Sequence, residues 1–527
     1  PPPNTVLLEL RTLEPDGRRL EADRHVGKTD LSLPRLSPGD AVERRWLAFE
    51  GPSTSHGGYI RRFFFGAEVP TARADLVVIV PDGMELEYRA LNGAPEPYVR
   101  REPGREIYIW QTRLQPAVAP EPFAAPAEEF LPHVVVWAGV DDHRALTANL
   151  ATGRRLADSS WYVDTKARSL VAPDAAPATR LAVLEAWVRG RIASGPPRSP
   201  LETLLAESGS RNALLAAMAR AVGIDAELLV LRPGTSARVR STHPNPNHFE
   251  LLAGRARVGD AFHWWLLDDG FERAGRLPAE LRGGSCVVAT RAHPVPQPIE
   301  ETWIDSTPRV STLRAELSPD GTLTGTLTWT LNERHAAELA EFDRRVPVAE
   351  RAERLERALG ATWPGIELAD VRIAPSARRL DAHLAWPDFA HPAADGLRVD
   401  DLFSELPLGR VFGEPGPADF ASLAERETPL LVRESRELLR VRLALPDGMA
   451  PRELPRSFRR ITPFGSFERR AEPSADGTAL DLVHAEWLPQ IRVQPEDYSA
   501  FRQTLEVVMR ARRGGLVLVP TAEPGGP

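Results

Sequence analysis

"LETLLAESGSRNALLAAMARAVGIDAELLVL", residues 201–231, is the stretch that decides the fold of the central part of this chain. Its apolar residues recur at helical spacing, and Gly223 supplies a stop signal after them. The predicted apolar stripe consists of Leu214, Leu215, Met218, Ala221 and Val222. The period then changes, and "DAELLVL" (225–231) predicts a strand. A serine-rich turn at 208–210 therefore leads into a helix and then into a sheet.

The segments around this helix extend the pattern to an α+β region over residues 141–310. Upstream, "DDHRALTANLATGRRLADSSW" (141–161) and "APATRLAVLEAWVRGRIA" (176–193) carry leucines at helical spacing. Downstream, "HFELLAG" (248–254) and "FHWWLLDD" (262–269) predict strands. Helices followed by several short strands favour an antiparallel sheet covered by the helices.

Residues 1–140 predict a β-sandwich. Short alternating strands are separated by turns such as "EPDGRRL" (14–20), and in the first strand Val6, Leu8 and Leu10 are predicted to point inward. Aromatic residues recur over 61–110, which leaves open a carbohydrate-binding sandwich, although aromatic side chains spaced along strands are typical of a core. We identify no reactive group of residues in this part.

Residues 311–527 predict a second region that is mainly β. A Pro-Asp-Gly turn inside 311–332 indicates a long hairpin, and later strands are expected through 515–520. Two helices interrupt the strands, at 348–360 and 495–513. The whole chain is therefore expected to be a multidomain β and α+β protein.

Composition and charge exclude several functional classes. The chain has 527 residues, of which 42% are hydrophobic, and a net charge of −8. This charge argues against nucleic acid or an anionic membrane as partner, because both require a concentrated basic surface. No apolar run approaches the roughly 20 residues of a membrane-spanning helix, so the chain is not predicted to span a membrane. The sequence begins "PPPNTV" (1–6), and we expect it to belong to a longer parent chain or to a complex.

Three candidate site residues follow one another in the central part: Ser208 at the helix start, His248 and Asp268. Free N–H groups and the positive end of the dipole favour a thiolate or an oxyanion at a helix N-terminus. A histidine and a carboxylate on neighbouring strands would provide a base and the group that orients it. The same serines, 208 or 210, also fit a helix cap that accepts a backbone N–H bond.

This order of residues resembles the bacterial transglutaminase-like superfamily, which has a papain-like core. The resemblance is closest to members in which the core lies between two β domains of uncharacterised function. "ARAVGIDAELLVL" (219–231) fits the family helix end and strand, while His248 and Asp268 fit the family histidine and aspartate. Counting back from Gly223 places Ser208 at the family cysteine. The resemblance implies three domains, 1–140, 141–310 and 311–527.

The departures from the family pattern concentrate at the helix start. Ala206 and Glu207 replace the usual Gly-Asp, and the segment after Ser208 does not match the usual Lys-Asp-Lys-Ala. A serine hydroxyl has a pKa far above that of a cysteine thiol, and it cannot rest as an ion pair with histidine. Because the residues around the family cysteine position are lost, the resemblance predicts a catalytically inactive protein.

Other candidates have ordinary structural interpretations. Cys286, the only cysteine, is predicted to be a small core residue of a strand. His243, His248 and His263 lack the cysteines or carboxylates that a zinc site needs, so no metal and no cofactor are predicted.

We therefore expect a binding or scaffold module of the bacterial cell envelope that contacts another protein or a peptide segment. The alternative is an acyl transferase, amidase or peptidase with a Ser208–His248–Asp268 triad. The periplasm or envelope location is implied by the family resemblance alone, and a single cysteine is compatible with the cytoplasm as well.

Overall fold

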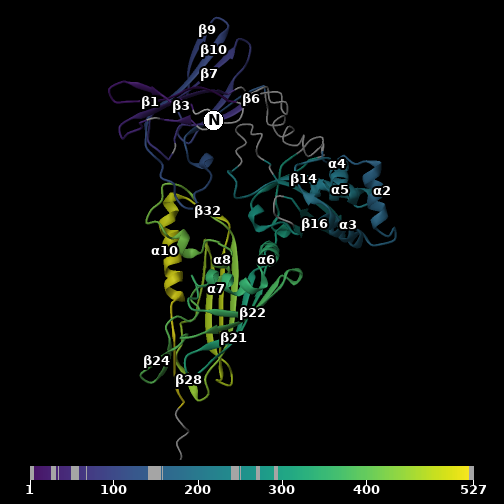
Figure 1. Cartoon of the computed structure of the whole chain (residues 1–527), viewed down its shortest axis with the longest axis vertical. Coiled ribbons are helices and arrows are strands. Elements are labelled where there is room, and N and C mark those ends of the chain that lie inside the picture. Colours follow the sequence, from purple (N-terminus) through teal and green to yellow (C-terminus); the bar gives the residue numbers. More distant parts are fainter. Residues whose placement is uncertain are drawn as a thin grey trace, which may run out of the picture.

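The computed structural model has strands and helices in each of the three regions that the sequence predicts (Figure 1). It describes residues 5–24, 31–33, 35–48, 59–66, 68–139, 156, 158–238, 249, 251–268, 273–289 and 295–521. Many small sheets and two groups of helices make this a mixed β and α+β architecture, as the sequence predicted. The boundaries at 140/141 and 310/311 stay predictions.

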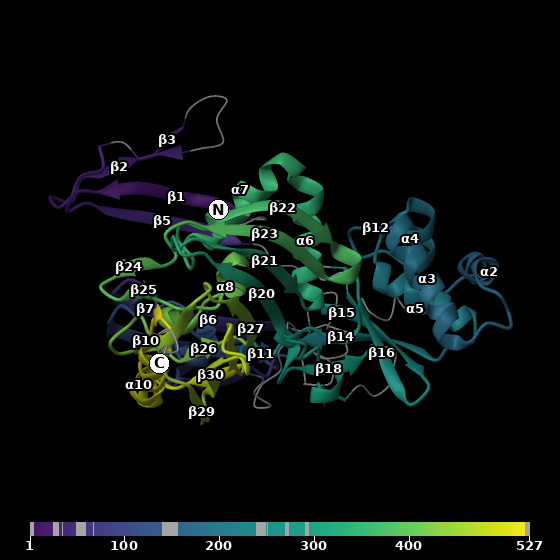
Figure 2. The ribbon, with the colours of Figure 1, turned by 90° about the horizontal axis from the view of Figure 1, so that it is seen from below.

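The N-terminal strands form an arm that projects from the rest of the molecule (Figure 2). Its main sheet has the order β2 (Arg19–Glu21), β1 (Thr5–Leu13), β5 (Ala41–Ala48), and β3 (Asp23–Arg24) pairs with β4 (Leu31–Ser32). The prediction of inward-facing Val6 and Leu8 is wrong, because these side chains are 51% and 55% exposed. The alternation itself is kept at the start of β1, but with the opposite set inward, because Thr5, Leu7 and Glu9 are the partly buried side chains.

The rest of the first part is a two-layer β structure. One sheet has the order β7 (Thr71–Pro81), β10 (Arg105–Gln115), β9 (Tyr98–Glu102), and the other β6 (Tyr59–Phe64), β11 (His133–Ala138), β8 (Glu87–Leu91). Their shared core consists of Phe65, Val80, Leu86, Trp110, Val134, Val136 and Ala138. Tyr88 and Tyr108 pack on Trp110, so aromatic residues of 61–110 contribute to this core.

The central part packs helices on one face of an antiparallel sheet (Figure 1). The helices are α2 (Trp161–Leu170), α3 (Pro177–Arg191), α4 (Pro200–Ala206) and α5 (Arg211–Ala221). The sheet has the order β17 (Arg273–Gly275), β16 (Ala261–Leu266), β15 (Leu251–Val258), β14 (Ala226–Arg232), β18 (Ser285–Val288), β19 (Gln297–Pro298). This confirms the predicted α+β arrangement, while most of the predicted 141–161 helix lies outside the described residues.

Helix α5 is buried on every side, whereas the sequence predicted one apolar stripe. All residues from Arg211 to Ala219 are buried, since α2, α3 and α4 surround the faces that the sheet does not cover. The helix ends before Gly223, which has the positive φ of +80° expected of a C-terminal glycine. Most of α5 therefore lies at the centre of the core of this part.

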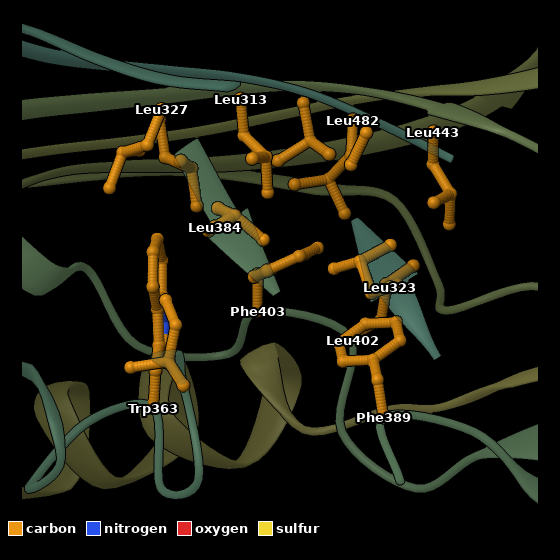
Figure 3. Close-up of a cluster of buried hydrophobic side chains, with 14 of the residues drawn as sticks. Leu313, Leu323, Leu327, Trp363, Leu384, Phe389, Leu402, Phe403, Leu443 and Leu482 are labelled. Carbon is orange, nitrogen blue, oxygen red and sulfur yellow. The ribbon is translucent and has the colours of Figure 1, made fainter. Parts of the chain in front are cut away.

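The C-terminal part is built on an eight-stranded sheet, β22 (Glu367–Ala374), β23 (Arg379–Trp386), β21 (Leu323–Thr330), β20 (Arg309–Leu317), β27 (Ser435–Ala444), β31 (Ala479–Leu488), β30 (Gly465–Pro473), β29 (Phe458–Thr462). A smaller sheet has the order β24 (His391–Ala393), β25 (Gly396–Val399), β33 (Leu516–Pro520), β28 (Met449–Glu453). Leucines of the large sheet face Trp363, Phe389 and Phe403 across the core (Figure 3).

Two features of this part were not predicted. β20 and β27 pair in parallel although they are far apart in the sequence, and helix α6 (Glu333–Arg345) follows the first hairpin. The predicted helices correspond to α7 (Arg351–Leu359) and α10 (Pro495–Arg512), and two short helices, α8 (Pro407–Val411) and α9 (Pro417–Phe420), lie between strands. Helix α10 runs alongside the sheet (Figure 1).

Buried arginine contacts connect the three parts. Arg492, in β32 (Ile491–Val493), donates to both carboxylate oxygens of Glu129 at 2.9 Å. The same guanidinium donates to the carbonyls of Gly234 at 3.0 Å and Ser236 at 2.7 Å. One side chain of the C-terminal part thus binds both other parts, and its planar group suits several acceptors at once.

Candidate functional site

The segment before α5 is shaped by local backbone requirements. Helix α4 begins with a capping box formed by Ser199 and Glu202, and it ends at Glu207 in the left-handed conformation (φ 50°). Strand β13 (Ser208–Gly209) then pairs in parallel with β12 (Ala193–Ser194). A Cβ atom at Gly209 would lie 2.5 Å from the Thr203 hydroxyl, so the turn that leads into α5 requires glycine.

Ser210, and not Ser208, is the cap of α5. Its hydroxyl accepts the N–H of Ala213 at 3.3 Å and donates to the Asp268 carboxylate at 3.0 Å. Ser208 lies in β13, where its Oγ approaches the space beside Gly195, and it makes no side-chain hydrogen bond to another described residue. The structural interpretation of a serine cap is therefore confirmed at position 210.

Asp268 lies directly on the N-terminus of α5. One carboxylate oxygen accepts the N–H of Arg211 at 3.1 Å, and the other accepts the N–H of Asn212 at 3.2 Å. The Ser194 hydroxyl also approaches this carboxylate, at 3.5 Å. Asp268 is 7% exposed, so these charge-assisted bonds are largely shielded from water.

The first turn of α5 consequently has no free N–H group. Arg211 and Asn212 donate to Asp268, Ala213 donates to the Ser210 hydroxyl, and Leu214 donates to the Ser210 carbonyl at 3.1 Å. The first three are among the N–H groups that a helix leaves without partners inside its own ladder, whereas the Leu214 bond is the first bond of that ladder. A papain-like enzyme uses this end of the helix for its nucleophile and for charge developing on the substrate, and here a protein carboxylate occupies it.

Asn212 is a residue of this site that sequence reasoning missed. Its side chain donates to the Leu252 carbonyl at 2.9 Å and accepts the N–H of Leu267 at 2.8 Å. The Trp265 indole donates to the Asn212 carbonyl at 3.2 Å. An amide at the second position of an otherwise apolar helix was the available signal. These bonds fix α5 against β15 and hold the segment that carries Asp268 directly after β16.

The other predicted residues are placed as follows. His248 lies outside the described residues, so its relation to Ser208 and Asp268 stays a prediction. Cys286 is a buried residue of β18, as predicted, and burial raises the pKa of its thiol to about 11. His263 contacts Glu185 at 3.3 Å. Within the described ranges, no group of three or more His, Cys, Asp or Glu side chains is arranged to hold a metal ion.

Comparison with known proteins gives two matches. A family model described as a domain of unknown function with a solved structure, DUF3857, matches residues 28–119. Among solved structures, the fold is similar to that of a protein from Parabacteroides distasonis described as a "putative protease". The TM-score is 0.60 at 15% identity, over 98% of this chain and 89% of the other chain. No curated protein sequence matches this chain.

These matches agree with a coarse relation to the predicted superfamily. The DUF3857 match falls in the first β part, where the resemblance implied a domain of uncharacterised function. The similarity to the Parabacteroides structure extends over nearly the whole chain and concerns the fold alone. No helix among the described residues is long and apolar enough to cross a membrane.

Proposed function

We propose that this chain is a catalytically inactive transglutaminase-like protein, with Ser208 at the family cysteine position, that serves as a binding or scaffold module in the bacterial cell envelope. The observation that carries the inactivity is the Asp268 carboxylate on the N-terminus of α5. An anionic intermediate at this helix end would meet a fixed negative charge, and the N–H groups of Arg211, Asn212 and Ala213 are already engaged.

Neither Cys286 nor Ser210 can act as the nucleophile that the family places at the N-terminus of α5. Cys286 belongs to a strand of the sheet, is 1% exposed, and has a raised thiol pKa, so it is neither accessible nor activated. The Ser210 hydroxyl is engaged as donor to Asp268 and as acceptor from Ala213. A serine nucleophile would need a base beside its oxygen, and the carboxylate that would orient this base is engaged at the helix instead.

The binding or scaffold role is supported by the contacts between the parts. Arg492 joins all three, Arg282 of the central part pairs with buried Glu434, and the Arg426 guanidinium pairs with Glu121 of the first part at 3.2 Å. Such contacts favour one rigid body that presents several surfaces to another protein or a peptide. The envelope location rests on the family resemblance.

The test combines turnover with stability. Purified protein is assayed for hydrolysis of fluorescently labelled casein and for amine incorporation into casein, and we expect neither. Asp268→Ala should lower the free energy of unfolding by about 3 kcal/mol, because two helix N–H groups and the Arg211 side chain lose a buried acceptor. Ser169→Ala, at an exposed serine of α2, is the matched control and should change it by less than about 0.5 kcal/mol.

The enzyme alternative makes the opposite prediction. Turnover that Ser208→Ala abolishes, while Ser169→Ala leaves it intact, would establish the Ser208–His248–Asp268 triad and overturn the inactive assignment. Turnover that survives Ser208→Ala but not Ser210→Ala would assign the nucleophile to Ser210.

A further inference from the structure

Strand β5 (Ala41–Ala48) is the outer strand of the N-terminal arm, which projects from the rest of the molecule (Figure 2). One side of β5 pairs with β1, and its other side pairs with no described strand. Seven of its eight residues are exposed, and the side chains of Val42 and Trp46 are 49% and 43% exposed. A strand of this length at a sheet edge, without proline or lysine, is a template for pairing with another strand.

The hydrogen bonds of β1 show which residues of β5 face this edge. The Leu10 carbonyl accepts the N–H of Ala22, so the polar backbone groups of Leu10 point away from β5. Arg44 is directly opposite Leu10, and opposite residues of an antiparallel pair turn their N–H and C=O groups both inward or both outward. Arg44 therefore turns these groups to the edge, and Val42 and Trp46 do the same by the period of two. Within the described ranges these groups have no other backbone partner.

The side chains of the same three residues lie on one face of β5. Alternate positions of a strand project to the same face, so Val42, Arg44 and Trp46 form an apolar–basic–apolar row. The Arg44 guanidinium lies over the Trp46 ring, 4.6 Å from its centre. This row is exposed and follows the edge whose backbone groups are available. A strand added here would therefore meet all three side chains.

The opposite face of β5 already has its charges paired. Glu43 pairs with Arg11 at 2.5 Å, and Arg45 pairs with Glu9 at 3.3 Å. Of the charged side chains in β5, only that of Arg44 has no ion-pair partner in the described part of the chain. A carboxylate on an added strand, directly opposite Arg44, would form an ion pair across the new strand pair.

A second copy of this chain fits the edge poorly. Antiparallel pairing of two β5 strands about their middle places Arg44 opposite Arg44, Arg44 opposite Arg45, or Arg45 opposite Arg45. Like charges directly opposite each other are destabilising. An acidic residue with an apolar residue two positions away on each side would instead give the row one opposite charge and two apolar contacts. The edge therefore favours a strand of different sequence.

We propose that β5 binds an extended acidic peptide segment of another protein by antiparallel strand addition. The segment pairs its backbone with the outward groups of Val42, Arg44 and Trp46. It presents a carboxylate to Arg44 and an apolar side chain to each of the other two residues. Main-chain bonds supply the affinity, and the alternating side chains supply the specificity. This inference rests on the binding role proposed above and names its partner, but it does not depend on the chemistry of α5.

The experiment measures the binding of two fluorescein-labelled heptapeptides to the full chain by fluorescence anisotropy at pH 7. The first peptide is Ser-Val-Thr-Glu-Thr-Val-Ser, and the second has Lys in place of Glu. We expect the Glu peptide to bind, and the Lys peptide to bind at least about fivefold more weakly, because a like-charge pair replaces the ion pair with Arg44. The Glu peptide N-methylated at Glu and at both Val residues keeps its side chains but lacks the N–H groups that face β5, and it should not bind.

Three variants of the chain separate charge from backbone pairing. Arg44→Glu should reverse the preference, so that the Lys peptide binds more tightly than the Glu peptide. Val42→Pro removes an outward N–H that the fold does not use, and it should abolish binding of the Glu peptide. Arg398→Glu, at an exposed arginine of β25, is the control and should leave both affinities unchanged.

The comparison of peptides on the unaltered chain decides the matter if a variant does not fold. Equal binding of the Glu and Lys peptides, binding that survives N-methylation, or no binding of the Glu peptide would each overturn the proposal. A dimer in sedimentation velocity that Val42→Pro dissociates would assign the edge to a second copy and would overturn it as well. Turnover in the casein assays bears on the inactive assignment alone, so the two proposals fail separately.

Discussion

Arg492 offers the sharpest test of how the three parts are held together. Its side chain and that of Glu129 are each 10% exposed, and the guanidinium makes hydrogen bonds to Glu129, Gly234 and Ser236. Replacing it by methionine leaves a buried carboxylate whose remaining partner is the N–H of Arg238, at 3.1 Å. Breaking one side of a buried ion pair costs about 3–5 kcal/mol. We expect about 3 kcal/mol, because Arg238 compensates in part.

A double-mutant cycle isolates the pair. Arg492→Met, Glu129→Gln and the combined variant are unfolded in urea, and we expect an interaction energy of about 2 kcal/mol, within the range of contacting charged residues. Arg398→Met, at an exposed arginine that pairs with Asp400 at 2.7 Å, is the control and should change stability by less than about 0.5 kcal/mol.

Limited proteolysis gives a second readout for Arg492→Met, since loosened parts should expose new cleavage sites between them. An interaction energy below about 0.5 kcal/mol, together with an unchanged proteolysis pattern, would refute the idea that Arg492 joins the parts.

Three other predictions address local features. Cys286 should not react with iodoacetamide at pH 8 until urea unfolds the chain, because its thiol is buried and has a pKa of about 11; rapid labelling of folded protein would contradict this. Burial alone would raise the pKa of Glu414, but the His335 hydrogen bond and the Arg309 charge lower it to about 2. Glu414 therefore stabilises the fold fully above its unfolded pKa of about 4.3, and this stabilisation is lost as the pH falls toward 2. In urea unfolding, Glu414→Gln should lower the free energy of unfolding by about 3 kcal/mol at pH 7 and by far less at pH 2.5. An equal loss at both pH values would contradict the assignment. Gly254→Ala would place a Cβ 2.0 Å from the Trp265 ring and should cost about 1–3 kcal/mol by urea unfolding, whereas Gly190→Ala meets nothing within 4 Å and should cost nothing.

The sequence predicted best where local signals agreed with one another. The helix over 211–221 has an apolar run, a serine cap and a glycine stop, and α10 has acidic residues in its first turn and basic residues in its last. Each signal acts within a few residues, so it survives without knowledge of the tertiary structure. The hairpin of β20 and β21 is of the same kind.

The prediction failed where the decisive partner is distant in sequence. The parallel pairing of β20 with β27 leaves no local pattern. Val6 and Leu8 alternate as core residues do, yet their side chains are more than half exposed. Asp268 was recognised as a site residue, but its place on the α5 N–H groups follows from the packing of α5 against β15 and β16, which Asn212 fixes.

The contact between residues 121–125 and the C-terminal part has a consequence for biosynthesis. Glu121 accepts the N–H of Thr428, which lies 307 residues later, and the N–H of Ala125 donates to the Pro429 carbonyl. At about 5–20 residues per second, a ribosome needs roughly 15–60 s to make the intervening chain. During that time the Glu121 carboxylate and the Ala125 N–H of the nascent first part do not yet have their partners from the C-terminal part. Its last segment can dock only once most of the protein has been translated.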